Sequence, residues 1–94
     1  MGLMSDHYTA TYDGHSIEVE GRVTSIMGSA EYSLVVDNQR VDQIQGSLGR
    51  FVLRGQLVRE GSAAKTVQVR IKQGLLGTKY TLDVEGVECP LRKT

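Results

Sequence analysis

Two segments of similar sequence decide the fold of this chain: Tyr32-Ser-Leu-Val-Val36-Asp-Asn38 and Tyr80-Thr-Leu-Asp-Val84-Glu-Gly86. In both, Tyr, Leu and Val occupy every second position, and the two sets are offset by a constant 48 residues. A second alternating run precedes each segment, Ser16-Ile-Glu-Val in one copy and Thr66-Val-Gln-Val in the other. Each copy therefore predicts two strands, a glycine-marked loop and a tight turn, and two such hairpins can face each other and share one core.

The same alternation extends from Tyr8 to Leu91, with one face apolar and the other polar, which is typical of half-buried strands. Four turn signals separate the runs: Asp13-Gly14, Asp37-Asn38, Glu60-Gly61-Ser62 and Glu85-Gly86. The pattern predicts a compact all-β antiparallel sandwich of seven to eight short strands, built from two similar hairpin units. A small barrel gives the same local signals and stays open as an alternative. Residues 42–46 are the one segment that suits a helical turn or a bent connection.

Length and composition limit the organisation to one domain. The chain has 94 residues, is 39% hydrophobic and carries no formal net charge, which favours a single globular domain and gives bulk charge no part in nucleic-acid binding. We predict a flexible N-terminus over residues 1–6, a sandwich domain over 7–91 and a tail over 92–94. No apolar run is long enough for a membrane helix, and no signal peptide is visible, so we expect a soluble, cytoplasmic protein without membrane association.

The order of the motifs resembles the N-terminal domain of the Fas apoptotic inhibitory molecule family. The resemblance is carried by Asp13-Gly-His-Ser-Ile-Glu-Val-Glu20, Val35-Val-Asp-Asn38, Phe51-Val-Leu-Arg-Gly55, Gly61-Ser-Ala-Ala-Lys-Thr66 and Tyr80-Thr-Leu-Asp-Val-Glu-Gly86. It spans nearly the whole chain, from Tyr8 to Leu91. The chain differs from the family in having no tryptophan and one domain where the family members have two.

The resemblance implies a β module that binds other proteins, with links to survival signalling and to protection against protein aggregation. It supplies no catalytic or ligand-binding residue to transfer to this sequence. It therefore supports the predicted fold more strongly than it supports a particular role.

The charges are divided between the two halves of the sequence. Residues 1–43 hold two arginines against seven carboxylates, whereas residues 44–94 hold nine basic residues against four carboxylates. Arg54, Arg70 and Lys72 fall on outward positions of two predicted strands, so they could form one basic sheet face that attracts an acidic partner. The alternative is an ordinary mixed surface, which results if the halves interleave in space.

Leu75 and Leu76 lie between two glycines at a predicted hairpin tip. They are candidates for an exposed anchor that binds a partner. The alternative is that they fold back to close one end of the sandwich. The corresponding loop of the first copy, residues 25–28, is also apolar, which favours that alternative.

No catalytic or metal-binding motif is visible in the sequence. His15 follows a predicted turn and has Ser16 beside it, but a lone histidine in a turn is most simply an exposed side chain. Two histidines and one cysteine on separate strands give no zinc motif, and Cys89 falls on an inward position typical of a small buried apolar group. We therefore predict no catalytic residues, no metal and no cofactor.

The expected function is a non-enzymatic protein-interaction module that binds a partner protein, one with acidic groups, through the basic face or an edge strand. A weak homo-oligomer is compatible with this expectation, and nucleic acid is not an expected partner. The alternative is a sandwich that binds a small ligand or a carbohydrate. Sugar sites usually require exposed aromatic side chains, and all five aromatic residues of this chain fall on inward positions.

Overall fold

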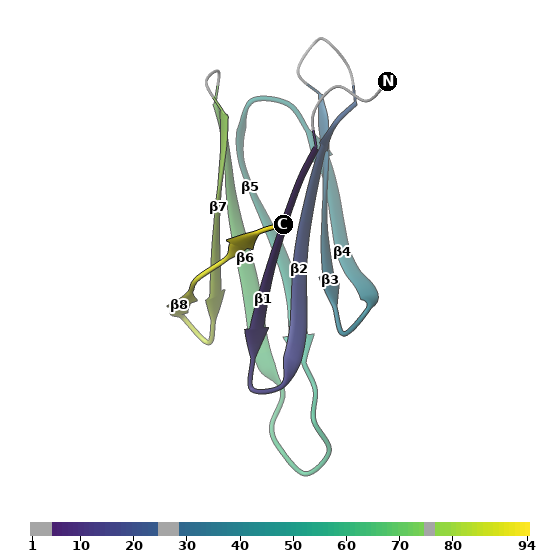
Figure 1. Cartoon of the computed structure of the whole chain (residues 1–94), viewed down its shortest axis with the longest axis vertical. Helices are drawn as coiled ribbons and strands as arrows, with labels where there is room; N and C mark the ends of the chain where they lie inside the picture. Colours follow the sequence, from purple (N-terminus) through teal and green to yellow (C-terminus); the bar gives the residue numbers. More distant parts are fainter. Residues whose placement is uncertain (1–4, 25–28, 75–76) are drawn as a thin grey trace.

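The fold is an all-β sandwich of two antiparallel sheets (Figure 1). The computed structural model describes residues 5–24, 29–74 and 77–94. The first sheet contains β1 (Ser5–Tyr12), β2 (His15–Val23), β3 (Ala30–Val36), β4 (Gln39–Gly46) and β9 (Arg92–Lys93). The second contains β5 (Gly49–Leu57), β6 (Lys65–Gly74), β7 (Gly77–Val84) and β8 (Val87–Cys89). The described residues contain no helix, and hence none that could span a membrane.

Each sheet contains a meander of four consecutive strands. The first has the order β4-β3-β2-β1-β9 and the second the order β5-β6-β7-β8, so after the second meander the chain returns to the first sheet with β9. The predicted antiparallel sandwich is confirmed, with nine strands in the described part of the chain instead of seven to eight. The additional strand is the two-residue β9, which pairs with β1 at Tyr8 and Thr9.

Three hairpins of this fold turn within two residues that have positive φ. These are Asp13-Gly14, Asp37-Asn38 and Glu85-Gly86, with φ values between 50° and 81°. Positive φ at both central positions is the requirement of the turn type whose twist matches that of the flanking strands. Aspartate, asparagine and glycine tolerate this conformation and occupy five of the six positions, the sixth being Glu85, so these dipeptides mark the turns in the sequence.

The core lies between the sheets and uses the alternation of both repeats. Among the described residues, thirteen buried apolar side chains form it: Ile17, Val19, Ala30, Tyr32, Leu34, Val36, Leu53, Leu57, Val67, Val69, Ile71, Leu82 and Val84. The first repeat contributes Leu34 and Val36, and the second contributes Leu82 and Val84 at the same offset. Both sheets thus bury their inward faces against each other, and burial of each such side chain contributes about 1.5–3 kcal/mol.

The repeat also appears in the hydrogen bonds that close the two units. The amide of Asp37 donates to the carbonyl of Ser16 at 2.8 Å, and the amide of Glu85 donates to that of Thr66 at 2.9 Å. In return, Ser16 N donates to Asp37 Oδ1 at 2.9 Å and Thr66 N donates to Glu85 Oε2 at 2.7 Å. The two units therefore share backbone pairing as well as sequence pattern.

Residues 42–46 are a correction to the sequence analysis. They belong to strand β4, without a helical turn. The irregular spacing of Val41 and Ile44 has another cause, because the β3–β4 register shifts between Leu34 and Val35 and leaves Val41 as the extra residue of a bulge. Val41 packs against β5 at Gly55, where a Cβ atom would collide with the valine side chain. A glycine is needed here for close approach of the two sheets.

Strand pairing extends beyond the limits predicted for the domain. Strand β1 begins at Ser5, inside the segment predicted as flexible, and residues 92–93 of the predicted tail form β9. Thr94 N also donates to the carbonyl of His7 at 2.9 Å. The two ends of the described chain are therefore joined in the first sheet.

Candidate functional site

The three predicted basic residues lie on the outer face of the second sheet. Arg54 is on β5 and Arg70 and Lys72 are on β6, and all three are exposed. Their neighbours in sequence point inward, because successive side chains of a strand alternate between the two faces. The structure thus brings the three predicted residues onto one surface.

The strand register adds two cations that the sequence analysis did not include. Arg50 of β5 pairs directly with Lys72, and Lys72 pairs with Lys79 of β7. Three basic side chains therefore stand in one row across three neighbouring strands. We call Arg50, Arg54, Arg70, Lys72 and Lys79 together the basic face.

Sequence reasoning missed Arg50 and Lys79 because it assigned faces without assigning a register. The signal was present at the β6–β7 hairpin, where Gly74 pairs with Gly77. The pairing of these two glycines sets the register that places Lys72 opposite Lys79. Leu75 and Leu76, the other predicted partner-binding residues, lie outside the described residues.

The basic face is only weakly neutralised by its own sheet. Arg70 pairs with Asp83 of β7 at 3.4 Å, while the other four cations form no ion pair with any residue that the structure describes. Glu88, opposite Asp83 on β8, is the second carboxylate on this side. Like charges directly opposite each other destabilise a sheet, so the row carries an electrostatic cost within the domain.

The two charge halves of the sequence correspond largely to the two sheets. Residues 5–46 form four strands of the first sheet and residues 49–89 form the second sheet. The exception is β9, which comes from the basic half and returns to pair with β1 in the first sheet. On the outer face of the first sheet, Glu18, Glu20 and Glu31 are balanced by Arg22, Arg40 and Arg92. Only the second sheet presents one dominant sign of charge.

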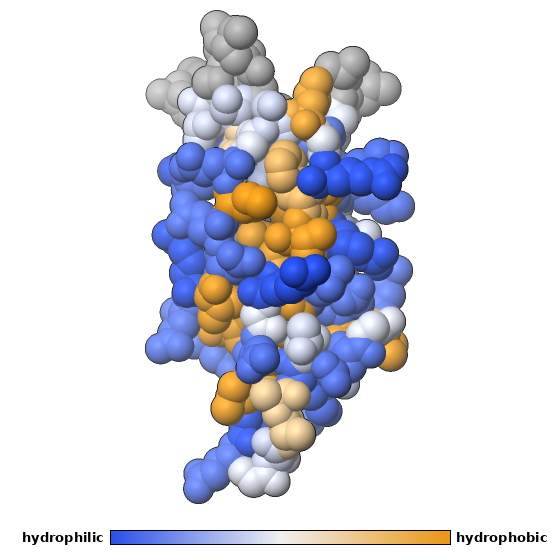
Figure 2. All heavy atoms as spheres, turned by 180° about the vertical axis from the view of Figure 1, so that it is seen from behind, coloured by the Kyte–Doolittle hydropathy of each residue, from blue (hydrophilic) through white to orange (hydrophobic). Residues whose placement is uncertain are grey.

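An apolar band runs beside the basic face, where β4 and β5 form neighbouring edges of the two sheets. Figure 2 shows this side as a strip of hydrophobic side chains flanked by hydrophilic ones. Val41 of β4, Leu48 of the connection and Val52 of β5 are 42%, 55% and 38% exposed. No described strand pairs with the outer edge of β5, although its Arg54 amide donates to Asp42 Oδ2 at 2.8 Å.

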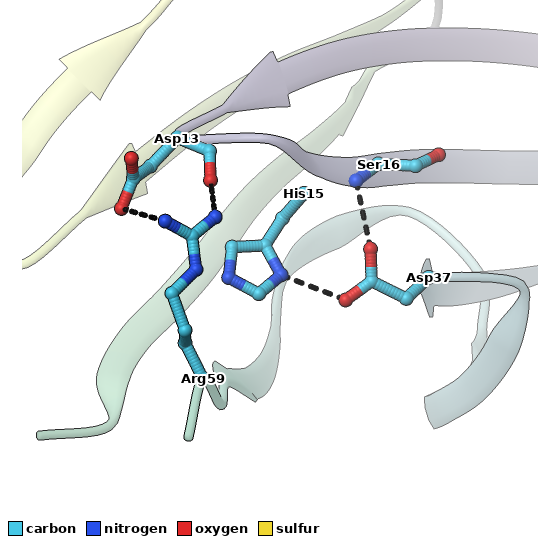
Figure 3. A network of polar contacts seen from close by, with 5 residues as sticks. All are labelled: Asp13, His15, Ser16, Asp37 and Arg59. Carbon is cyan, nitrogen blue, oxygen red and sulfur yellow. Dashed lines mark hydrogen bonds and ion pairs between the residues drawn. The ribbon is translucent and has the colours of Figure 1, made fainter. Parts of the chain in front are cut away.

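His15 is a correction to the prediction of an exposed turn residue. Its side chain is buried, with 9% of the residue exposed, and its Nδ1 lies 2.7 Å from Asp37 Oδ2. Figure 3 shows this contact at the end of the sandwich where the turns meet. The other oxygen of Asp37 accepts the Ser16 amide proton, and Arg59 binds Asp13.

These contacts lower the pKa of Asp37. The hydrogen bond from His15 is the largest cause, followed by that from the Ser16 backbone, and the charges of His15 and Arg59 act in the same direction. Each of these contacts favours the ionised carboxylate. The His15–Asp37 pair therefore links β2 to the β3–β4 turn. In the described part of the chain no hydrogen bond joins the Ser16 hydroxyl to His15.

The aromatic side chains pack against the core, as predicted. None of the five is exposed, and Tyr8, Tyr32, Phe51 and Tyr80 form a chain of ring contacts with centroids 5.0–6.1 Å apart. Tyr80 donates to Asp6 at 2.9 Å, and burial followed by this carboxylate raises the tyrosine pKa. The rings are therefore poorly placed to stack on a sugar.

Cys89 is half-buried and packs against the core. Its thiol lies 3.7 Å from the carbonyl of Val87.

Comparison of the chain with protein-family models, curated proteins and solved structures found no match. Nothing in these comparisons links it to the Fas apoptotic inhibitory molecule family, and that resemblance stays a prediction.

Proposed function

We propose that this chain is a non-enzymatic protein-interaction module that binds an acidic partner protein through the basic face. The observation that carries this proposal is the row formed by Arg50, Lys72 and Lys79 across β5, β6 and β7. In the isolated domain the three cations repel one another. Carboxylates of a partner would turn this repulsion into attraction, and they would also increase the rate of encounter.

The edge of β5 gives the partner a second mode of contact. An extended segment can add to an unpaired strand edge through backbone hydrogen bonds, while its side chains contact the flanking surfaces. Val41, Leu48 and Val52 border this edge and are exposed. The ligand that fits this surface is therefore an acidic segment that also carries apolar side chains.

The wider role follows from the resemblance alone. Survival signalling or protection against aggregation, in the cytoplasm, are the settings that the resemblance implies for such a module. The alternative of a carbohydrate or small-ligand site receives less support, since no aromatic side chain is exposed.

The test is affinity capture from lysate at low and high salt, with the bound proteins identified by mass spectrometry. The key variant combines Arg50→Glu, Lys72→Glu and Lys79→Glu. The matched control combines Arg22→Glu, Arg40→Glu and Arg92→Glu on the outer face of the first sheet, which changes the net charge equally. We expect the wild type and the control to capture acidic partners at low salt. The key variant should not capture these partners, and high salt should release them from the wild type.

Two results would contradict the proposal. If both triple variants lose the same partners, net charge and not the basic face is responsible. If the key variant retains all partners, the basic face takes no part in binding. A further variant that combines Arg54→Glu, Arg70→Glu and Lys72→Glu shows whether binding depends on the row or on the other cations of the basic face.

A further inference from the structure

Three potential metal ligands converge on the outer face of the first sheet. His7 of β1 pairs directly with Glu20 of β2, and Glu18 lies two residues away on the same face of β2. One ligand atom of each side chain lies within 4.8 Å of the others. Glu18 and Glu20 share one face of β2, and the β1–β2 register brings His7 beside them.

The imidazole of His7 is held from both sides. Its Nε2 lies 3.0 Å from Glu18 Oε1, and its Nδ1 lies 2.6 Å from Thr94 Oγ1. The Thr94 hydroxyl also donates to the carbonyl of His7 at 3.2 Å. With its proton committed there, Thr94 Oγ1 accepts a hydrogen bond from Nδ1–H. The contact of Nε2 with the Glu18 carboxylate, which can only accept, requires a proton on Nε2 in the metal-free protein. A metal ion would displace that proton and bind the Nε2 lone pair beside the carboxylate.

The third ligand is available for coordination. Glu20 is exposed and forms no ion pair with any described residue, whereas the nearby Arg22 binds Glu31 at 3.5 Å. His7 and Glu20 also line a groove of about 290 Å³ on this face. This groove leaves room for a water molecule or a partner's side chain as a fourth ligand.

We propose that His7, Glu18 and Glu20 form a site for a divalent transition metal of the zinc class. One imidazole nitrogen with two carboxylate oxygens is a ligand set that Zn²⁺ accepts, and the two carboxylates balance its charge. Ligands at about 2.0–2.2 Å from the ion are at most about 4.4 Å apart, so a small side-chain rotation closes the site. Ca²⁺ and Mg²⁺ prefer oxygen-only ligand sets and are expected to bind much more weakly.

A metal at this site would strengthen the joining of the chain ends. It would link β1 to β2 directly, and the contacts of His7 with Thr94 would connect the ion to the segment that follows β9. Thr94 acts here as a positioning residue, because it orients the imidazole without touching the ion.

The experiment is calorimetric titration of the tag-free full chain with Zn²⁺, accompanied by the absorption spectrum with Co²⁺. We expect one ion per chain, with bands typical of four-coordinate Co²⁺, and a rise in melting temperature with Zn²⁺ but not with Ca²⁺ or Mg²⁺. Glu20→Gln keeps the shape of an exposed side chain and should weaken Zn²⁺ binding at least about tenfold. Thr94→Ala should weaken it about 10–100-fold by releasing the imidazole.

The controls separate this site from adventitious binding. Glu88→Gln removes an exposed carboxylate from the second sheet, and Cys89→Ser removes the thiol of the chain. Both variants should bind Zn²⁺ as the wild type does. Three results would overturn the proposal. They are Zn²⁺ binding by Glu20→Gln and His7→Ala as strong as that of the wild type, absence of binding by the wild type at millimolar Zn²⁺, and loss of binding in Cys89→Ser. The melting curve of each variant without metal verifies that it is folded.

Discussion

The two hairpin units share a backbone design but differ in the side chains placed around it. Asp37 and Glu85 close equivalent turns and form the same pair of hydrogen bonds with Ser16 and Thr66. Before Ser16, however, stands the buried His15, which binds the second oxygen of Asp37. The equivalent of His15 in the second unit is Lys65.

Where His15 binds Asp37, Lys65 makes a contact other than one with Glu85, the carboxylate of its own turn. Its ammonium lies over the ring of Tyr12, 5.2 Å from the ring centroid. The outer surfaces diverge in the same way, since one sheet carries a mixed face and the other carries the basic face. The features that produce the fold are thus duplicated, whereas the features that could bind a partner or a metal are not.

The largest effect should come from the core, where the two units are equivalent. Leu34 and Leu82 are both fully buried at matching positions. Leu34→Ala and Leu82→Ala should each lower the free energy of unfolding by about 2–5 kcal/mol, measured by urea denaturation. A loss below 1 kcal/mol in only one of the two variants would show that the core does not use the repeats equally.

The next effect should distinguish the two turns. Asp37→Asn weakens two hydrogen bonds, those that the carboxylate accepts from the His15 ring and from the Ser16 amide. Glu85→Gln weakens the one that its carboxylate accepts from the Thr66 amide. We therefore expect a larger fall in melting temperature for Asp37→Asn, because charge-assisted bonds to carboxylates are the stronger ones. Equal falls for the two variants would mean that the contact with His15 contributes nothing to stability.

Acid should reveal the same contact in the wild type. The folded pKa of Asp37 is depressed, so its contribution to stability is present above the unfolded value of about 3.9 and is lost as pH falls through the folded pKa. The difference in melting temperature between wild type and Asp37→Asn should therefore be present at about pH 5 and shrink below about pH 4. A difference that is unchanged down to pH 2 would contradict this assignment.

The smallest effect should come from the basic row. Lys72→Ala removes the central cation between Arg50 and Lys79 and should raise the free energy of unfolding by about 0.2–1 kcal/mol at low salt, with the gain disappearing at high salt. Arg22→Ala on the opposite face removes an attractive pair with Glu31 and should show no gain. A loss of stability in Lys72→Ala would mean that the lysine contributes packing that outweighs the repulsion.

Most of the fold was predictable because its signals are local. Alternation assigned the buried positions of both repeats, and the dipeptides at 13–14, 37–38 and 85–86 marked the tight turns through their tolerance of positive φ. The prediction for residues 42–46 was wrong because a bulge at Val41 breaks the alternation. A bulge is stabilised by the facing strands and leaves an ambiguous local pattern.

The sites were less predictable because they depend on the pairing of distant residues. Arg54, Arg70 and Lys72 could be assigned to an outer face from alternation alone. Arg50 and Lys79 could not be added without the register. His15 was expected to be exposed because it follows a turn, but Asp37, 22 residues away, holds it in the interior.

The sequence by itself determined the strands, their inward faces, the tight turns and the unequal distribution of charge, because each depends on neighbouring residues and on the period of a strand. Only the tertiary structure decided that most of each charge half lies in its own sheet, that three cations stand in one row, and that His7 meets Glu18 and Glu20. These outcomes follow from strand order and register, which are set by the packing of whole faces against each other.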